Sequence, residues 1–299
     1  MALLRPLHWV KNLPVLAPLI FAGLILDPPS LSLSTAAVGV FCLLASGVYA
    51  FNDIHDAAWD RKHPVRKHRP IASRTISPSL GLVLSLLCIL LGLAGVFSLE
   101  QAAPPLTSEG LASVGPLGWA IAYLAINVAY TLGLKRLPII DLLCLAALFV
   151  LRPLLGAAVL QRDPSTWLVV CSACLALFLA TGKRYLEAVQ HGLGPDSARP
   201  LLTPYSPPFL LRILALSAAV TLASYVTYTL ADATVEKVGS SMLLATTPFV
   251  LIGIVQYWRL ILAGEGDDPA ELLVHDKVTV VAITTWSFSA LAIVHGLLG

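Results

Sequence analysis

The sequence contains little charge. Of its 299 residues only 12% are Asp, Glu, Lys or Arg, and 57% are hydrophobic, whereas ordinary soluble domains carry about 25% charged residues. This scarcity excludes a soluble domain and predicts an integral membrane protein surrounded by a lipid bilayer. The formal net charge is only +2, and nothing in the charge pattern indicates nucleic acid as a partner.

Cysteine is also scarce. The chain has five cysteines, all of them inside apolar runs, where they can serve as small hydrophobic residues. Cys171 and Cys174 have the spacing of half a zinc site, but neither a second cysteine pair nor a histidine pair accompanies them. We therefore expect packing rather than zinc here, and no disulfide framework.

Long apolar runs, by contrast, are abundant, and a helix needs about 20 apolar residues to cross a bilayer. Nine runs of roughly this length, the first of them short, lie at residues 13–27, 32–52, 78–98, 113–133, 138–160, 166–186, 209–231, 241–262 and 278–298. They predict an all-α polytopic membrane protein with nine transmembrane helices in one bundle, so that residues 1–299 form a single domain.

The distribution of cationic residues predicts the orientation, because Lys and Arg are retained on the cytoplasmic side of a membrane. With a cytoplasmic N-terminus, sixteen of the 19 Lys and Arg residues fall in cytoplasmic segments. Two of these segments, residues 53–77 and 183–205, are long and polar. We expect them to cap a site that faces the cytoplasm.

The most unusual stretch is FNDIHDAAWDRKH, at the end of the second run. Asn52, Asp56 and Asp60 are spaced i, i+4 and i+8, and Asp53 lies three residues before Asp56. If the helix continues through them, all four project from one face. Like charges at this spacing repel, so a cation should compensate. Mg²⁺ is suitable, because it takes oxygen ligands and shares them with substrate phosphates; neutralisation by the bases that follow, as a solvated helix end, is the alternative.

The bases that follow read RKHPVRKHRPIAS. Such a run can be the cationic anchor that lies on the cytoplasmic side, or a contact for anionic lipid headgroups. Acidic metal ligands followed at once by cations can also hold a phosphorylated substrate from both sides, with the metal on a diphosphate and Arg or Lys on the other oxygens. Both interpretations can hold for different residues of the run.

NDxxDxxxD at this position resembles the first aspartate-rich motif of the UbiA superfamily of intramembrane prenyltransferases. Within that superfamily, four stretches are similar to the decaprenyl-phosphate phosphoribosyltransferase branch: RPLHWVKN, DRKHPVRKHRPIAS, YTLGLKRLPIIDLL and GKRYLEA. Aromatic prenyltransferases of the superfamily usually have a second aspartate-rich motif where this chain has GKRYLE. One departure is Arg74, where the branch often has glycine.

The resemblance implies a bacterial inner-membrane enzyme that moves 5-phosphoribosyl from phosphoribosyl pyrophosphate to a polyprenyl phosphate, with Mg²⁺ as cofactor, for envelope polysaccharide synthesis. It implies Mg²⁺ and pyrophosphate binding by Asn52, Asp53, Asp56 and Asp60, the three aspartates being catalytic. The further candidates for substrate contact are Lys11, Arg61, Arg69, Lys135, Asp141, Lys183, Arg184 and Glu187. Asp141 has a second interpretation, as a partner of a nearby base.

Two other functions are open. One is prenyl transfer from a prenyl diphosphate to an aromatic or quinone precursor, and the other is transport with the acids as a cation site. Transporters place such groups near the bilayer midplane, whereas these acids lie at a helix end. Arg152 is deeper, roughly 20 Å into the run 138–160 at 1.5 Å per residue. We expect it to face the bundle interior for helix packing, to reach outward to the interface, or to contact substrate.

Overall fold

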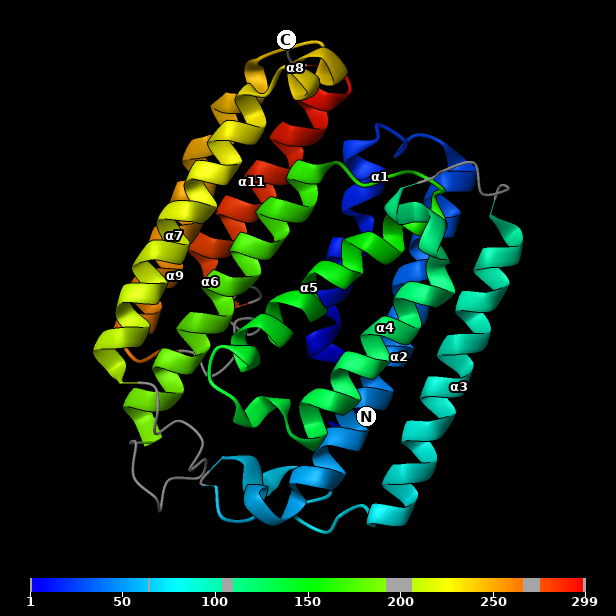
Figure 1. The fold of residues 1–299 in the computed structure, drawn as a ribbon, viewed down its shortest axis with the longest axis vertical. Coiled ribbons are helices and arrows are strands. Elements are labelled where there is room, and N and C mark those ends of the chain that lie inside the picture. The colour runs from blue at the N-terminus through cyan, green and yellow to red at the C-terminus, as the bar shows by residue number, and fades with distance from the viewer. Residues whose placement is uncertain (1, 64, 104–109, 192–205, 266–274, 298–299) are drawn as a thin grey trace.

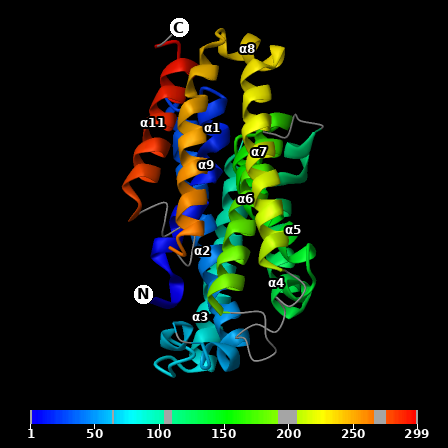
Figure 2. The ribbon, with the colours of Figure 1, turned by 90° about the vertical axis from the view of Figure 1, so that its left-hand side faces the viewer.

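The computed structural model describes residues 2–63, 65–103, 110–191, 206–265 and 275–297, and these residues form helices and turns without any strand. The long helices run roughly along the long axis of the molecule (Figures 1 and 2). They are α2 (Pro28–Asp60), α3 (Pro78–Ala102), α4 (Gly115–Leu132), α5 (Ile140–Val159), α6 (Thr166–His191), α7 (Pro207–Leu230), α9 (Thr247–Leu262) and α11 (Lys277–Val294).

Eight helical segments in the described ranges are long and apolar enough to cross a membrane, which confirms eight of the nine predicted spans. Two of the eight include a 3₁₀ turn: η4 (Leu111–Val114) precedes α4, and η7 (Met242–Thr246) precedes α9. The short helix α8 (Asp232–Val238) follows α7. Several of the long helices begin at a side-chain cap, in which Asp27, Ser77 and Ser206 each accept a backbone N–H bond and are each followed by proline.

The predicted first span, residues 13–27, is different. The chain forms the 3₁₀ helix η2 (Pro6–Leu16) and then the five-residue helix α1 (Ala17–Phe21). Pro14 explains the break, because an interior proline removes a hydrogen bond of the α-helix and clashes with the carbonyl four residues earlier. Eleven residues at about 2.0 Å and five at about 1.5 Å still extend about 30 Å.

The two largest of the five hydrophobic clusters among the described residues lie in different groups of helices. The first joins η2, α2, α3, α4 and α5 and includes Val15, Phe41 and Leu155; the second joins α6, α7 and α9 around Phe178 and Leu214. In Figure 1 the two groups lie on opposite sides, with α3 at one edge and α7 near the other. α5 lies inside the bundle, since residues 151–159 are all buried, whereas α3, α7, α9 and α11 leave most of their surface for lipid.

Close contact between α2 and α3 depends on a small residue. The Ser85 hydroxyl donates a 2.7 Å hydrogen bond to the Gly47 carbonyl, and a methyl group at Gly47 would lie 2.7 Å from a side-chain carbon of Ile89. Such contacts are typical of helices that pack within membranes, where small residues let the backbones approach. They bring the polar end of α2 next to the start of α3.

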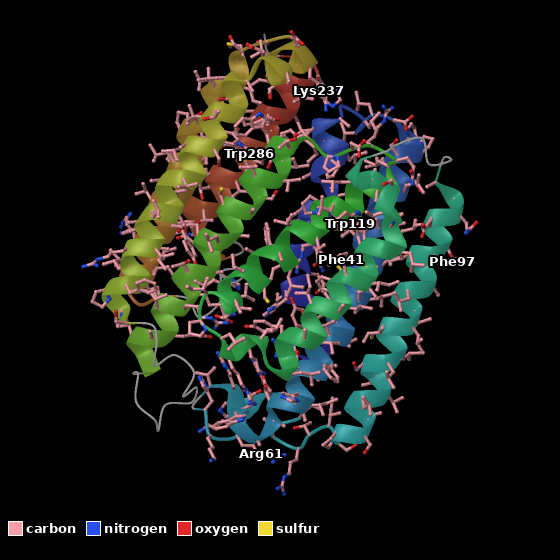
Figure 3. All side chains as sticks on the ribbon, in the orientation of Figure 1. Phe41, Arg61, Phe97, Trp119, Lys237 and Trp286 are labelled. Carbon is pink, nitrogen blue, oxygen red and sulfur yellow. The ribbon has the colours of Figure 1, made fainter. Side chains whose placement is uncertain are left out.

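We call the end of the bundle at which α2 finishes, at Asp60, the site end. Arg61 lies there, and Lys237 lies at the opposite end (Figure 3). The helix η3 (Arg66–His68) and the turn after it connect α2 to α3 at the site end, and α6 ends near them. Of the predicted caps, residues 53–60 are helical rather than loop, as are 183–191, and residues 192–205 lie outside the described residues.

Candidate active site

The acid-rich end of α2 is one continuous helix, because no proline or glycine interrupts residues 48–60. Asp53 is 1% exposed and Asp60 3% exposed, while Asp56 is partly buried. His55 and Trp59 lie on the exposed side of the same turns. The acids therefore share the inward face, as their spacing predicts.

Three cations from three other parts of the chain meet these acids. Arg5, between η1 (Ala2–Leu4) and η2, pairs with Asp53. The Arg69 Nη1 atom lies 3.2 Å from Asp53 Oδ1 and 2.7 Å from Asp60 Oδ2. Lys135 pairs with Asp56. The repulsion among the three carboxylates is thus compensated by cations that come from outside the helix.

Arg5 is the member of this group that sequence reasoning missed. Its backbone is left-handed, with φ 49°, and its guanidinium lies 5.2 Å from the centroid of the Tyr49 ring. A left-handed residue other than glycine is uncommon and points to a constraint. The sequence feature that could have identified Arg5 is its position as the first residue of RPLHWVKN, one of the stretches that resemble the related branch.

The end of α4 also meets α2. Thr131 donates a hydrogen bond to the Oδ1 atom of Asn52, and Lys135 follows in the 3₁₀ helix η5 (Leu134–Arg136). Asn52 and Lys135 therefore both lie beside the acids of α2, and Asn52 is held by a threonine hydroxyl in this structure.

The end of α6 carries the opposite charge. Arg184 is 2% exposed, and its Nε and Nη2 atoms lie 2.5 Å and 2.7 Å from the two carboxylate oxygens of Asp141. Its Nη1 atom donates to Glu187, and its Nη2 atom also lies 2.7 Å from the Tyr130 hydroxyl. This bidentate pair connects α5 and α6, and Tyr130 adds α4. Asp141 pairs with a base, in agreement with the second of its two interpretations.

Arg66 joins the two ends. Its Nη2 atom lies 2.9 Å from Glu187 Oε1, and Arg69, three residues later, binds Asp53 and Asp60. Glu187 therefore accepts from the buried Arg184 on one oxygen and from the basic segment on the other. The acid-rich end of α2 and the cationic end of α6 are parts of one polar site, linked by residues 66–69.

The structure also gives the positions of three further predicted residues, Lys11, Arg61 and Lys183. The Lys11 ammonium lies 3.4 Å from His8 Nδ1 within η2, and Arg61 is exposed, with its Nε atom donating to the Ala72 carbonyl over 3.3 Å. Lys183 is half-buried on α6 beside Arg184.

Arg74, where the related branch often has glycine, has φ 63°. That left-handed conformation explains the preference for glycine.

The donor chemistry of the α2 end fits a hard divalent cation. The described residues contain no group of three or more His, Cys, Asp or Glu side chains arranged to hold a metal. Mg²⁺ does not need such a group, because it takes one or two carboxylates together with substrate phosphates and water. Asp53 and Asp60 already converge on one cation, the Arg69 guanidinium, and the buried Asp53 Oδ2 atom has no hydrogen-bond partner.

Apolar helices long enough to span a bilayer, with paired acids and bases buried at one end, define an integral membrane protein with a polar site at one end of its helix bundle. The chain belongs to the UbiA prenyltransferase family, whose model matches residues 13–288. It is a transferase of the decaprenyl-phosphate phosphoribosyltransferase branch of that family, because the curated relatives below carry that name over nearly the whole chain.

The decaprenyl-phosphate phosphoribosyltransferase of Corynebacterium glutamicum is 30% identical over 98% of this chain and 85% of its own length. The enzyme of the same name from Mycobacterium tuberculosis is 28% identical over 95% of this chain and 90% of its own. A UbiA homolog from Archaeoglobus fulgidus, solved with GPP and Mg²⁺, superposes with a TM-score of 0.71 at 16% identity, covering 97% of this chain and 98% of that one. The likeness to that structure shows a shared fold.

Proposed function

We propose that this transferase moves the 5-phosphoribosyl group of phosphoribosyl pyrophosphate to a polyprenyl phosphate of decaprenyl type and releases pyrophosphate. The product would be a phosphoribosyl polyprenyl phosphate, a lipid-linked precursor for envelope polysaccharide. The protein would lie in the bacterial inner membrane with the site end facing the cytoplasm, where the soluble donor is available. The segments 53–77 and 183–205, each of which begins as the end of a long helix, would cap the site of a single domain.

One observation carries the proposal: the end of α6 presents a buried arginine where a second acidic cluster would otherwise bind a second metal. Arg184 is bonded to Asp141 and Glu187, so these two acids are already neutralised and the α6 end needs no second metal. The cations that face the same region and can bind phosphate are Arg66, Arg69 and Lys135. A prenyl diphosphate presents one anionic group, its diphosphate, to the site. A phosphoribosyl donor and a lipid phosphate together present three, namely the pyrophosphate, the 5-phosphate and the lipid phosphate, and binding them needs more cations. The names of the curated relatives point the same way.

Asp53, Asp56 and Asp60, with the Asn52 carbonyl oxygen, would hold Mg²⁺. When bound, Mg²⁺ supplies charge neutralisation to the leaving pyrophosphate. Arg69 and Lys135, released from their carboxylates, would bind the remaining phosphate oxygens. The bond from ribose C1 to the pyrophosphate oxygen breaks while a lipid phosphate oxygen bonds to C1. Because that oxygen is already anionic, the residues position the reactants and exclude water rather than remove a proton.

The test uses the purified full chain in lipid nanodiscs, with labelled phosphoribosyl pyrophosphate and decaprenyl phosphate. We expect an acid-labile labelled lipid that forms with Mg²⁺ and not with EDTA. The same preparation is given a prenyl diphosphate with an aromatic acceptor, and labelled donor is also followed across proteoliposomes. Prenylated product without phosphoribosyl lipid would replace the proposal with prenyl transfer, and uptake without product would replace it with transport. Asp53→Asn should lower the rate of product formation by about 10²- to 10³-fold, whereas Asp232→Asn, which changes an exposed acid on α8, is the matched control.

A further inference from the structure

The N-terminal segment η2 lies antiparallel along α2 in a regular register. Four contacts step down the two elements in opposite directions, and together they cover the segment from the site end to the middle of the bundle. They pair Arg5 with Asp53, His8 with Tyr49, Trp9 with Ser46 and Asn12 with Cys42. Asp53 and Cys42 are eleven residues apart, about 16 Å along an α-helix. Seven residues of 3₁₀ helix, from Arg5 to Asn12, cover about 14 Å.

This segment needs anchors from outside. A 3₁₀ helix has poorer hydrogen-bond geometry than an α-helix and is uncommon beyond three or four residues, yet η2 has 11 residues with a proline inside. Near the site end, the Trp9 indole donates to Ser46 over 3.1 Å, and Ser46 donates to the Leu4 carbonyl over 2.9 Å. These bonds fix one end of the segment.

The other anchor is Arg152 of α5, about 18 Å along that helix from Ile140. Arg152 is 6% exposed. Its Nε atom donates to Asn12 Oδ1 over 3.0 Å, and its Nη1 atom donates to the Leu148 carbonyl of its own helix. Asn12 in turn donates from Nδ2 to Cys42 over 3.3 Å. One asparagine, 1% exposed, thus connects η2 to α5 and to α2.

Within the described residues Arg152 has no carboxylate partner; three aromatic rings surround it instead. The guanidinium carbon lies 5.5 to 5.7 Å from the ring centroids of Phe41, Tyr123 and Phe149. Cation–π contacts become stronger where water is excluded. A charge at this depth is costly unless it faces the bundle and finds partners, and the Asn12 carbonyl oxygen is the only side-chain oxygen from another described element that Arg152 bonds.

The backbones of η2 and α5 approach each other just beyond this point. A methyl group built on Gly156 would lie 2.0 Å from the Val15 carbonyl oxygen, so only glycine allows the contact. Gly156 lies one turn after Arg152 on α5. This close approach keeps η2 beside α5, but it includes no hydrogen bond. The position of η2 along α5 is therefore set by the bond between Asn12 and Arg152.

We propose that Arg152 is a positioning residue of the transferase: through Asn12 it sets the register of η2 on α2, and that register holds Arg5 against Asp53. The inference rests on the proposed function in one respect, namely that Asp53 belongs to the donor site. Without the bond to Asn12, η2 can slide or rotate on α2. The Arg5 guanidinium is then no longer placed beside Asp53, from where it can pass to a phosphate of the donor when the metal takes the acid.

The experiment measures amide hydrogen exchange and kinetics on the full chain in nanodiscs. Arg152→Met keeps the volume and removes the donors. We expect exchange in peptides covering residues 5–16 to become about tenfold faster, since a hydrogen bond to a charged group is lost. The KM for phosphoribosyl pyrophosphate should rise about tenfold, and the KM for decaprenyl phosphate should change by less than about twofold. General destabilisation would lower the active fraction and leave both KM values unchanged.

Three further variants separate the explanations. Asn12→Leu removes the acceptor and leaves the Arg152 guanidinium between its aromatic rings. It should reproduce both effects, so it decides the question if Arg152→Met does not fold. Asn12→Asp keeps an acceptor for the guanidinium and should retain the protection of residues 5–16. The double variant Arg152→Met with Asn12→Leu should be no worse than either single one, because the two act through one bond. Arg162→Met, an exposed arginine, is the matched control.

Hydrogen exchange is measured without turnover, so it tests the bond between Arg152 and Asn12 even if the chain does not use phosphoribosyl pyrophosphate. Failure to use that donor would contradict only the proposed function. Unchanged exchange at residues 5–16 in Arg152→Met or Asn12→Leu overturns the inference. Faster exchange with an unchanged donor KM also overturns it, because Arg152 would then stabilise the bundle without positioning the site.

Discussion

The ends of α2 and α6 both carry buried charges that need partners of opposite sign, but the two helices contribute charges of different sign. At the end of α2 the helix supplies three acids, and the cations come from distant segments, with Arg5, Arg69 and Lys135 each on a different one. At the end of α6 the helix supplies the cation, Arg184, and the acids come from α5 and from the next turn.

The two ends differ in how easily their partners can exchange. The Arg5 and Arg69 side chains are 19% and 28% exposed, whereas that of Arg184 is 2% exposed and bonded to two carboxylates and a hydroxyl. A buried, fully bonded ion pair cannot release its partners without a large desolvation cost, while partly exposed cations can move from a carboxylate to a phosphate. We therefore expect the cations at the end of α2 to move from carboxylates to substrate phosphates, and Arg184 at the end of α6 to stay on its carboxylates.

The most severe test of the comparison is Arg184→Met. Removing the guanidinium leaves Asp141 and Glu187 buried without it, and breaking a buried ion pair costs about 3–5 kcal/mol. We expect the unfolding temperature in detergent to fall by about 10 °C, with loss of activity in proportion to loss of folded protein. Differential scanning fluorimetry checks this.

Arg212→Met, an exposed arginine on α7, is the control and should leave the unfolding temperature unchanged. If Arg184→Met keeps the stability of the unmodified chain and only raises the donor KM, then Arg184 contacts substrate directly, and the α6 end exchanges partners as the α2 end does.

Asp53→Asn tests the α2 end. The amide keeps the shape and loses the charge that Arg5 and Arg69 share. We expect the transferase rate to fall by about 10²- to 10³-fold, the usual effect of removing one electrostatic contributor to a transition state, while the unfolding temperature changes by only a few degrees. Rates at several Mg²⁺ concentrations, with Asp232→Asn as the control, distinguish the two ends; a large stability loss with a normal rate would reverse their roles.

Lys135→Met should have a smaller effect. Lys135 pairs with Asp56, which is partly exposed, so a bridging metal or water can replace the ammonium as a partner of that acid. Loss of one charged hydrogen bond to a phosphate predicts a donor KM about ten- to thirtyfold higher with kcat nearly unchanged. Steady-state kinetics against Lys237→Met, an exposed lysine at the opposite end, would show it; a loss confined to kcat would make Lys135 a transition-state contact instead.

Local patterns in the sequence predicted the helices and one half of the site. Eight spans follow from composition alone, because a bilayer requires about 20 apolar residues per helix. The shared face of Asn52, Asp53, Asp56 and Asp60 follows from helical spacing, since nothing between them breaks the helix.

Contacts between distant segments could not be predicted in this way. Arg66 and Glu187 are 121 residues apart, and no local period relates them. Arg5 was overlooked because its partner lies 48 residues away and its left-handed backbone leaves no pattern. The 3₁₀ form of η2 was missed because its apolar run resembles a short helix, and only the effect of Pro14 on backbone hydrogen bonding distinguishes the two.

The smallest predicted effect concerns the segment that links the two ends. Arg74 is exposed and left-handed, which costs an ordinary residue about 1 kcal/mol, whereas glycine adopts it freely at some cost in unfolded-chain entropy. Arg74→Gly should therefore raise the stability by at most about 1 kcal/mol and leave the transferase rate unchanged, because Arg66 and Arg69 keep their acids. Arg74→Ala removes the same charge without relieving the backbone and is the matched control. A rate that changes with glycine but not with alanine would show that the left-handed backbone at Arg74 keeps Arg69 between Asp53 and Asp60. The conformation of this turn would then control the cations at the end of α2.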